Sequence, residues 1–153
     1  MSQTNELEIM ERIALDLEGV EESLASSFNT GAEDFNALIR PLSAAGGKRL
    51  RAQLCLLIAN AGTSVERQRI RIAEAVEMLH LATLIHDDVL DQAEIRRGEE
   101  TIHMHKGNKV AILSGDYLFA KAFQIVSEMP NMKYLQVFSH IITCLVEGEF
   151  MQM

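Results

Sequence analysis

Three aspartates close together, Asp87, Asp88 and Asp91, form the group in this sequence with the clearest potential for chemistry. If the stretch is helical, the side chains of Asp87 and Asp91 lie on one face, one turn apart. Two like charges at that spacing destabilise an isolated helix by roughly 0.2–0.5 kcal/mol, so a bound cation would relieve the repulsion. Mg²⁺ binds one or two protein carboxylates together with waters and phosphate oxygens. The spacing therefore predicts that Asp87 and Asp91 bind Mg²⁺ beside an anionic ligand.

The basic residues gather in two short segments, Lys48–Arg51 and Arg96–Arg97. The first follows Gly46 and Gly47, and we expect it to form the first turn of a helix. Free N–H groups and the positive end of the dipole attract anions there, whereas cations in the same turn oppose the dipole. This conflict indicates phosphate binding, and an ordinary solvated basic turn is the alternative.

Composition limits the class of protein to which these residues belong. The chain has 153 residues, 48% of them hydrophobic, two prolines and no tryptophan, which predicts a single all-α domain. The net charge of −8 argues against a nucleic-acid partner. No secretory signal and no apolar run long enough to span a bilayer are visible, so we expect a cytoplasmic chain without an integral membrane segment. Cys55 and Cys144 lie in apolar runs and are expected to be buried free thiols.

Apolar residues recur every three or four positions over most of the chain. This periodicity predicts helices over residues 6–27, 34–40, 53–60, 66–91, 108–127 and 131–153. The second is expected to end at Pro41, the third to be buried, and residues 92–106 to form a loop with short helical turns. The aspartates then lie at the carboxyl end of the fourth helix, where the dipole disfavours negative charge, so a bound cation is again indicated.

Three histidines need separate interpretation. His80 lies seven residues before Asp87 and shares its helix face, which favours ligand binding over the alternative of a buried core histidine. His103 and His105 are two residues apart, but no further clustered Cys or His supports a zinc site, so solvated histidines are expected.

Several segments together resemble one family. They are G-G-K-R-L-R, H-L-A-T-L-I-H-D-D-V-L-D, R-R-G and N-K-V-A-I-L-S-G-D-Y-L. In this order and spacing they resemble the trans-isoprenyl diphosphate synthases, or polyprenyl synthetases, particularly the bacterial medium- and long-chain members, from about Gly46 onward. The resemblance implies the N-terminal half of the isoprenoid synthase helical bundle.

The resemblance also implies an activity, which is head-to-tail condensation of isopentenyl diphosphate with an allylic diphosphate, with Mg²⁺ as cofactor. Asp87 and Asp91 would be the catalytic, metal-binding residues, and Arg96 would contact the allylic diphosphate. The residues implied in isopentenyl diphosphate binding are Lys48, Arg51, His80 and Arg97, with Arg49 as a weaker candidate.

Further residues carry expectations about product length and packing. In the family, side chains upstream of the first aspartate limit the growing chain, and Ala82 and Thr83 at those positions carry no aromatic ring. We therefore expect a medium- or long-chain product. Asp116 is expected to be a structural hydrogen-bonding residue, and Gly115 is expected to allow close helix packing.

Full-length family members are considerably longer and carry a second aspartate-rich motif. After Asp116 the acidic residues of this chain are Glu128, Glu147 and Glu149, which do not form such a motif. The chain is therefore interpreted as a truncated synthase, as a natural half completed by a partner chain, or as a non-catalytic relative that binds diphosphates or a synthase subunit. The family is normally homodimeric, and the two last helices are apolar enough to form such an interface.

Overall fold

Helices account for most of the computed structural model, which describes residues 3–28, 33–44, 47–62 and 64–152. The elements in chain order are α1 (Gln3–Ser27), α2 (Glu33–Ala44), α3 (Leu50–Asn60), α4 (Glu66–Leu90), β1 (Ile95–Arg96), β2 (Glu99–Glu100), α5 (Ile102–Lys106), α6 (Asn108–Ser127) and α7 (Met132–Gln152). The predicted all-α fold is confirmed. Gly46, which the sequence analysis paired with Gly47, lies outside the described residues.

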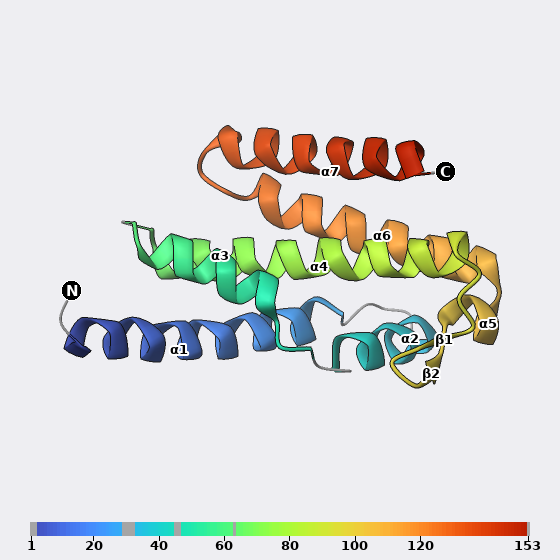
Figure 1. The fold of residues 1–153 in the computed structure, drawn as a ribbon, viewed down its shortest axis with the longest axis horizontal. Coiled ribbons are helices and arrows are strands. Elements are labelled where there is room, and N and C mark those ends of the chain that lie inside the picture. The colour runs from blue at the N-terminus through green and yellow to red at the C-terminus, as the bar shows by residue number, and fades with distance from the viewer. Residues whose placement is uncertain (1–2, 29–32, 45–46, 63, 153) are drawn as a thin grey trace.

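Helix α4 is the central element of the bundle. It packs along α6 on one side and against α1 and α3 on the other, while α7 packs on α6 (Figure 1). Fully buried side chains from several helices meet around α4, among them Leu24, Leu56, Met78 and Leu118. The hydrophobic core therefore fixes the face of α4 that remains for the aspartates and His80.

The predicted helix boundaries agree with the structure for α4, α6 and α7 to within one residue. Two predictions at boundaries are wrong. Helix α2 does not end at Pro41 but continues to Ala44. Proline can adopt the helical φ, and the carbonyl of Ala37, which loses its N–H partner to Pro41, lies at an exposed position that water can reach. Helix α3 begins at Leu50, so Lys48 and Arg49 precede the helix instead of lying in its first turn.

The segment expected to be a loop with helical turns contains the helical turn α5 and also a short hairpin. Strands β1 and β2 pair antiparallel, with Ile95 opposite Glu100 and Arg96 opposite Glu99. The turn between them consists of Arg97 (φ 55) and Gly98 (φ 88). Positive φ at both central residues matches the twist of a two-residue hairpin. The conformation of this turn therefore determines the direction of the Arg97 side chain.

Two predictions of burial are wrong. Helix α3 was expected to be buried, but it contacts α1 and α4 on one side only, and the apolar side chains on its other side are exposed. These are Leu50, Leu54, Leu57 and Ile58. Cys144 is exposed on α7, whereas Cys55 is half-buried and burial raises its thiol pKa. Both cysteines are free, as predicted.

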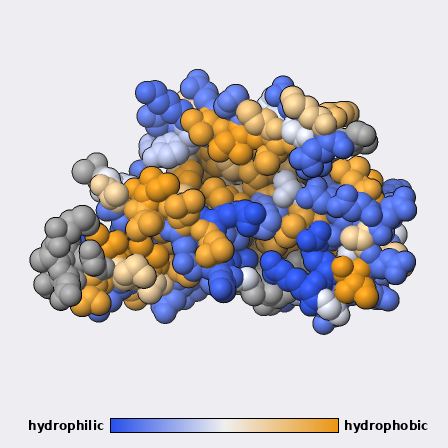
Figure 2. Space-filling model, viewed as in Figure 1, coloured by the Kyte–Doolittle hydropathy of each residue, from blue (hydrophilic) through white to orange (hydrophobic). Residues whose placement is uncertain are grey.

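Helix α7 presents an apolar stripe away from its contact with α6. Residues spaced three or four apart on one side of the helix are exposed; they are Tyr134, Val137, Ile141 and Leu145. The space-filling view shows hydrophobic surface in this part of the molecule as well as over α3 (Figure 2). An exposed apolar area of this kind is typical of a surface that contacts another protein segment.

Gly115 lies where α6 packs closely against the His86 side chain of α4. A Cβ atom at this position would lie 2.3 Å from His86 Nε2 and 2.5 Å from His86 Cδ2. The His86 ring also stacks on Phe119, with ring centroids 5.6 Å apart. The expectation that Gly115 allows close packing is therefore confirmed, and the contact involved is with the His86 ring.

We expect Gly115→Ala to lower the free energy of unfolding by about 1–3 kcal/mol, because the added methyl group must displace the His86 ring. Gly148→Ala is the matched control, since a Cβ atom there meets nothing within 4 Å. This control is expected to stabilise the chain by about 0.5–1 kcal/mol through helix propensity. Urea unfolding followed by circular dichroism measures both, and equal effects of the two substitutions would contradict the packing argument.

Candidate active site

The basic segment before α3 lies against the hairpin turn. A Cβ atom on Gly47 would lie 3.4 Å from Arg97 Nη2, so the guanidinium of Arg97 covers the backbone at Gly47. Lys48 and Arg51 follow directly and are exposed. Segments about 50 residues apart in the sequence are thus brought together, as the resemblance implied.

His80 is half-buried on α4, and three arginines and one carboxylate act on its charge. Burial lowers the pKa of His80, and the positive charges of Arg51, Arg97 and Arg96 lower it further, while Glu77 opposes the shift. The structure therefore gathers arginines from α3 and the hairpin around His80. We refer to Arg51, His80, Arg96 and Arg97 as the basic cluster.

Asp87 and Asp91 lie at the carboxyl end of α4, next to this basic cluster. Asp87 is half-buried, and Asp91 is the exposed C-cap, whose N–H donates to the Asp87 carbonyl oxygen at 2.8 Å. Burial raises the pKa of the Asp87 carboxyl, and the charges of Glu149, Asp91 and Asp88 raise it further against the opposing charge of Arg96. The carboxyl end of α7, which carries Glu149, lies over the same end of α4 (Figure 1).

This concentration of negative charge fits a divalent cation. The charge of Asp91 disfavours the ionised form of Asp87, and a cation between the two carboxylates would reverse that effect. Among the described residues, no three His, Cys, Asp or Glu side chains are arranged around one metal position. A metal here would complete its coordination with waters and ligand oxygens, which is the usual habit of Mg²⁺.

Asp88 and Arg96 form an ion pair that attaches the hairpin to α4. Arg96 Nε donates to Asp88 Oδ1 at 2.6 Å, and Asp88 is buried. The sequence analysis gave Asp88 no role of its own. Its structural contribution is to hold Arg96 beside the aspartates, in a position to meet an anion bound there.

Arg49 has a different environment from its neighbours Lys48 and Arg51. It is buried, its Nε and Nη2 donate to the Glu21 carboxylate at 2.6 and 3.1 Å, and its Nη1 lies 3.6 Å from Glu77 Oε2. The hydrogen bond to Glu21 is the main reason that its pKa is raised. Arg49 therefore holds the segment to α1 and α4 through these contacts and is buried, whereas Lys48 and Arg51 are exposed.

His86 connects the aspartate-bearing end of α4 to α6. Its Nε2 lies 3.2 Å from the Ile112 carbonyl oxygen and 3.4 Å from Asp116 Oδ1. Asp116 thus has the structural partner expected for it. The sequence analysis missed His86, although its place directly before Asp87 and opposite Gly115 was the available signal.

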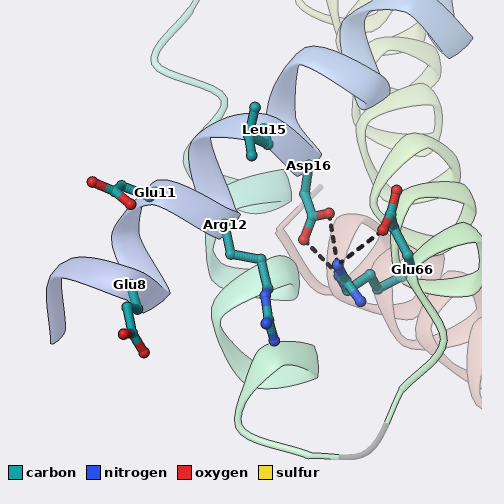
Figure 3. Close-up of a pocket in the computed structure, with 7 residues that line it drawn as sticks. Glu8, Glu11, Arg12, Leu15, Asp16 and Glu66 are labelled. Carbon is teal, nitrogen blue, oxygen red and sulfur yellow. Dashed lines mark hydrogen bonds and ion pairs between the residues drawn. The ribbon is translucent and has the colours of Figure 1, made fainter. Parts of the chain in front are cut away.

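Two other features do not contribute to the basic cluster or to the pair of aspartates. His103 lies in α5 with its Nδ1 3.0 Å from Thr101 Oγ1, and neither it nor His105 belongs to a metal-binding group among the described residues. A surface pocket formed by α1 and the start of α4 contains the ion pair between Asp16 and Arg69 (Figure 3). No residue of the basic cluster and neither predicted metal ligand lines this pocket.

Comparison with solved structures identifies the fold. A polyprenyl synthase from Caulobacter crescentus, solved in complex with calcium and isoprenyl diphosphate, superposes with a TM-score of 0.86 at 35% identity, covering 93% of this chain and 44% of that one. A decaprenyl diphosphate synthase from Rhodobacter capsulatus gives a TM-score of 0.85 at 33% identity, covering 95% and 45%. The chain is therefore an all-α protein of the isoprenoid synthase fold.

Sequence comparison identifies the family. Octaprenyl diphosphate synthase of Escherichia coli is 34% identical over 145 residues, which is 95% of this chain and 45% of that protein. Chloroplastic solanesyl diphosphate synthase 1 of Arabidopsis thaliana is 34% identical over 150 residues, or 94% and 37%. The family model for polyprenyl synthetase matches residues 32–153. The chain belongs to the polyprenyl synthetase family, and it spans less than half the length of these relatives.

Proposed function

We propose that this chain takes part in prenyl transfer, in which isopentenyl diphosphate condenses with an allylic diphosphate to give a medium- or long-chain all-trans polyprenyl diphosphate. The observation that carries the proposal is geometric: the Arg97 guanidinium lies against Gly47, next to Lys48, and Arg96 is held by Asp88 beside the paired aspartates at the end of α4. Relatives named octaprenyl, solanesyl and decaprenyl diphosphate synthases support the chain length.

In this proposal one group of residues binds isopentenyl diphosphate and another binds the allylic diphosphate. Lys48 and the cluster residues Arg51, His80 and Arg97 would hold isopentenyl diphosphate, because guanidinium groups donate in pairs to phosphate oxygens. Arg96, oriented by Asp88, would donate to the allylic diphosphate near Asp87 and Asp91. Mg²⁺ bound to Asp87 and Asp91 would stabilise the negative charge that develops on the leaving diphosphate.

Turnover tests this function. The folded chain is incubated with Mg²⁺, labelled isopentenyl diphosphate and farnesyl diphosphate, first alone and then with the C-terminal half of the E. coli octaprenyl diphosphate synthase added as a separate chain. We expect extended prenyl diphosphates in at least the second reaction. A folded chain that binds diphosphate but gives no product in either reaction would favour the alternative, a non-catalytic diphosphate-binding or partner subunit of a heteromeric synthase.

Product length is expected to respond to Ala82, whose side chain is fully buried on α4. We expect Ala82→Phe to shorten the longest product in the reaction that turns over, because an aromatic ring blocks the path of the growing chain. Thin-layer chromatography of the labelled products measures this. Thr83→Ser is the control, since its hydroxyl can keep the bond to the His80 carbonyl oxygen at 2.9 Å, and unchanged length in Ala82→Phe would contradict the prediction.

We also propose that the chain associates with a second polypeptide, as a homodimer or with a partner chain, through the apolar stripe of α7. Its exposed side chains support this, and light scattering is expected to give more than the monomer mass of 17.1 kDa. Substituting Ile141 by Glu on the stripe is expected to shift the mass toward the monomer, whereas Thr143→Glu, off the stripe, is expected to leave it unchanged. A monomer at all concentrations would contradict the homodimer, and a monomer that also stays separate when the C-terminal half of a relative is added would contradict association with a partner chain.

The proposed location is the cytoplasm, without a nucleic-acid partner. Helix α6 is long and apolar enough to cross a membrane by length and composition alone. Its side chains Ala111, Leu118 and Ala122 are buried in the bundle, mainly against α4, which supports its interpretation as a core helix.

A further inference from the structure

A buried carboxylate on α4, Glu77, contacts the segment that carries Lys48 and Arg51. Only 4% of the residue is exposed. Its Oε1 accepts a hydrogen bond from the backbone N–H of Ala52 at 3.0 Å, and its Oε2 lies 3.6 Å from Arg49 Nη1. Glu77 also precedes His80 by three residues, so it lies next to His80 along the same helix. One side chain therefore connects the beginning of α3 with the helix that carries the basic cluster.

The segment before α3 needs such a connection because its backbone is strained. Arg49 adopts φ 45 and ψ 40, in the left-handed region that a residue with a Cβ atom seldom occupies. A conformation of this kind persists only where surrounding contacts determine it. Here those contacts are the pair of hydrogen bonds from Arg49 to Glu21 and the ion pair with Glu77. They determine the direction in which the chain leaves Lys48 and enters α3 at Leu50, and so the position of Arg51 in the first turn of the helix.

We propose that Glu77 is a positioning residue for diphosphate binding: through the Ala52 N–H and the Arg49 guanidinium it holds segment 47–51 against α4, so that Lys48 and Arg51 face the same ligand as His80 and Arg97. Glu77 itself does not touch the ligand. This inference rests on the proposed function, since it assumes that isopentenyl diphosphate binds at the basic cluster.

Calorimetric titration of the full chain with isopentenyl diphosphate tests the inference. In Glu77→Gln the amide oxygen can still accept from Ala52, but the charge facing Arg49 is lost. We expect the Kd to rise about tenfold, as for loss of one charged hydrogen-bonding partner. The matched control is Glu74→Gln, which also removes a buried carboxylate from α4. Its partners are Ser23, Ser27 and Arg71, none of which belongs to segment 47–51, so its Kd is expected to stay within about twofold.

A double-mutant cycle separates positioning from a general loss of stability. If Glu77 acts through the segment, Glu77→Gln and Arg51→Ala together should raise the Kd by less than the product of their separate effects. A merely structural Glu77 would lower the unfolding midpoint and leave the Kd of the folded chain unchanged. That result, or equal weakening by Glu74→Gln, would overturn the inference while leaving the proposed function intact.

Two further outcomes are decisive. If Glu77→Gln does not fold, Arg49→Gln removes the other side of the contact without changing α4, and an unchanged Kd in that variant would overturn the inference. If the unsubstituted chain binds no isopentenyl diphosphate, the proposed function fails at this site and the inference fails with it. The experiment therefore distinguishes the two failures.

Discussion

Replacing Asp87 by asparagine is expected to reduce the Mg²⁺-dependent affinity of the chain for farnesyl diphosphate more than about 100-fold. The neutral amide is a poor ligand for a hard cation, and loss of a direct ligand exceeds the 10–100-fold effect typical of an outer partner. Calorimetry with and without Mg²⁺ measures the change. Asp91→Asn should behave similarly, whereas Glu100→Gln, an exposed carboxylate on β2, should have little effect.

The same substitution has an opposite expected effect on stability in the absence of metal. The pKa of Asp87 is raised above its ordinary value of 3.8, so the folded chain binds the proton of this carboxyl more tightly than the unfolded chain does. Its contribution to stability is therefore present below pH 3.8 and is lost as the pH rises through the raised pKa. Asp87→Asn removes this loss, so at neutral pH it should be at least as stable as the unsubstituted chain while binding far less metal and ligand. A less stable Asp87→Asn variant would contradict this account of the site's charge.

Replacing Asp16 by alanine is expected to lower the free energy of unfolding by about 3–5 kcal/mol, because it leaves the Arg69 guanidinium buried without its main partner. Asp16 is 3% exposed and accepts hydrogen bonds from Arg69 Nε and Nη2 at 2.5 and 2.9 Å (Figure 3). That hydrogen bonding is also the first cause of the raised Arg69 pKa. The pair joins α1 to α4 through two residues that are 53 positions apart in the sequence.

Glu66→Ala provides the control for Asp16. Glu66 lies 3.9 Å from the same Arg69, but its side chain is 74% exposed, so its removal is expected to change the free energy of unfolding by no more than about 1 kcal/mol. Chemical denaturation monitored by circular dichroism compares the two variants. Similar losses in both would show that the buried ion pair is not what holds α1 against α4.

Much of the fold was predictable because periodic apolar residues determine where helices form, and α6 matches its predicted bounds at both ends. The hairpin was not, since its strands are two residues long and its turn, Arg97–Gly98, lacks the usual Asn-Gly signal. The burial of α3 was predicted wrongly because an apolar composition does not reveal which faces of a helix find neighbours. Cys144 was misplaced for the same reason.

The candidate site was likewise predictable only in part. Residue type and spacing indicated Asp87 and Asp91, because two carboxylates at the end of a helix repel each other and oppose its dipole. The basic residues were indicated by their clustering in the sequence, although Lys48 and Arg49 precede the helix in which they were expected. The resemblance marked Arg49 as a weaker candidate than Lys48 and Arg51, but nothing in the sequence supplied a physical reason for the difference. That reason is one left-handed backbone conformation and two carboxylates distant in the chain. Glu77 and His86 were missed because the sequence alone does not show that a polar residue on a mixed helix face packs against another element.

The most direct test of the central claim is a crystal structure of the chain grown with Mn²⁺ in place of Mg²⁺ and with isopentenyl diphosphate, using anomalous scattering to locate the metal. The account predicts metal at Asp87 and Asp91 and diphosphate oxygens within hydrogen-bond distance of Arg51, His80 and Arg97. Diphosphate bound elsewhere, such as the pocket beside Arg69, or metal absent from the two aspartates at saturating concentration, would contradict it.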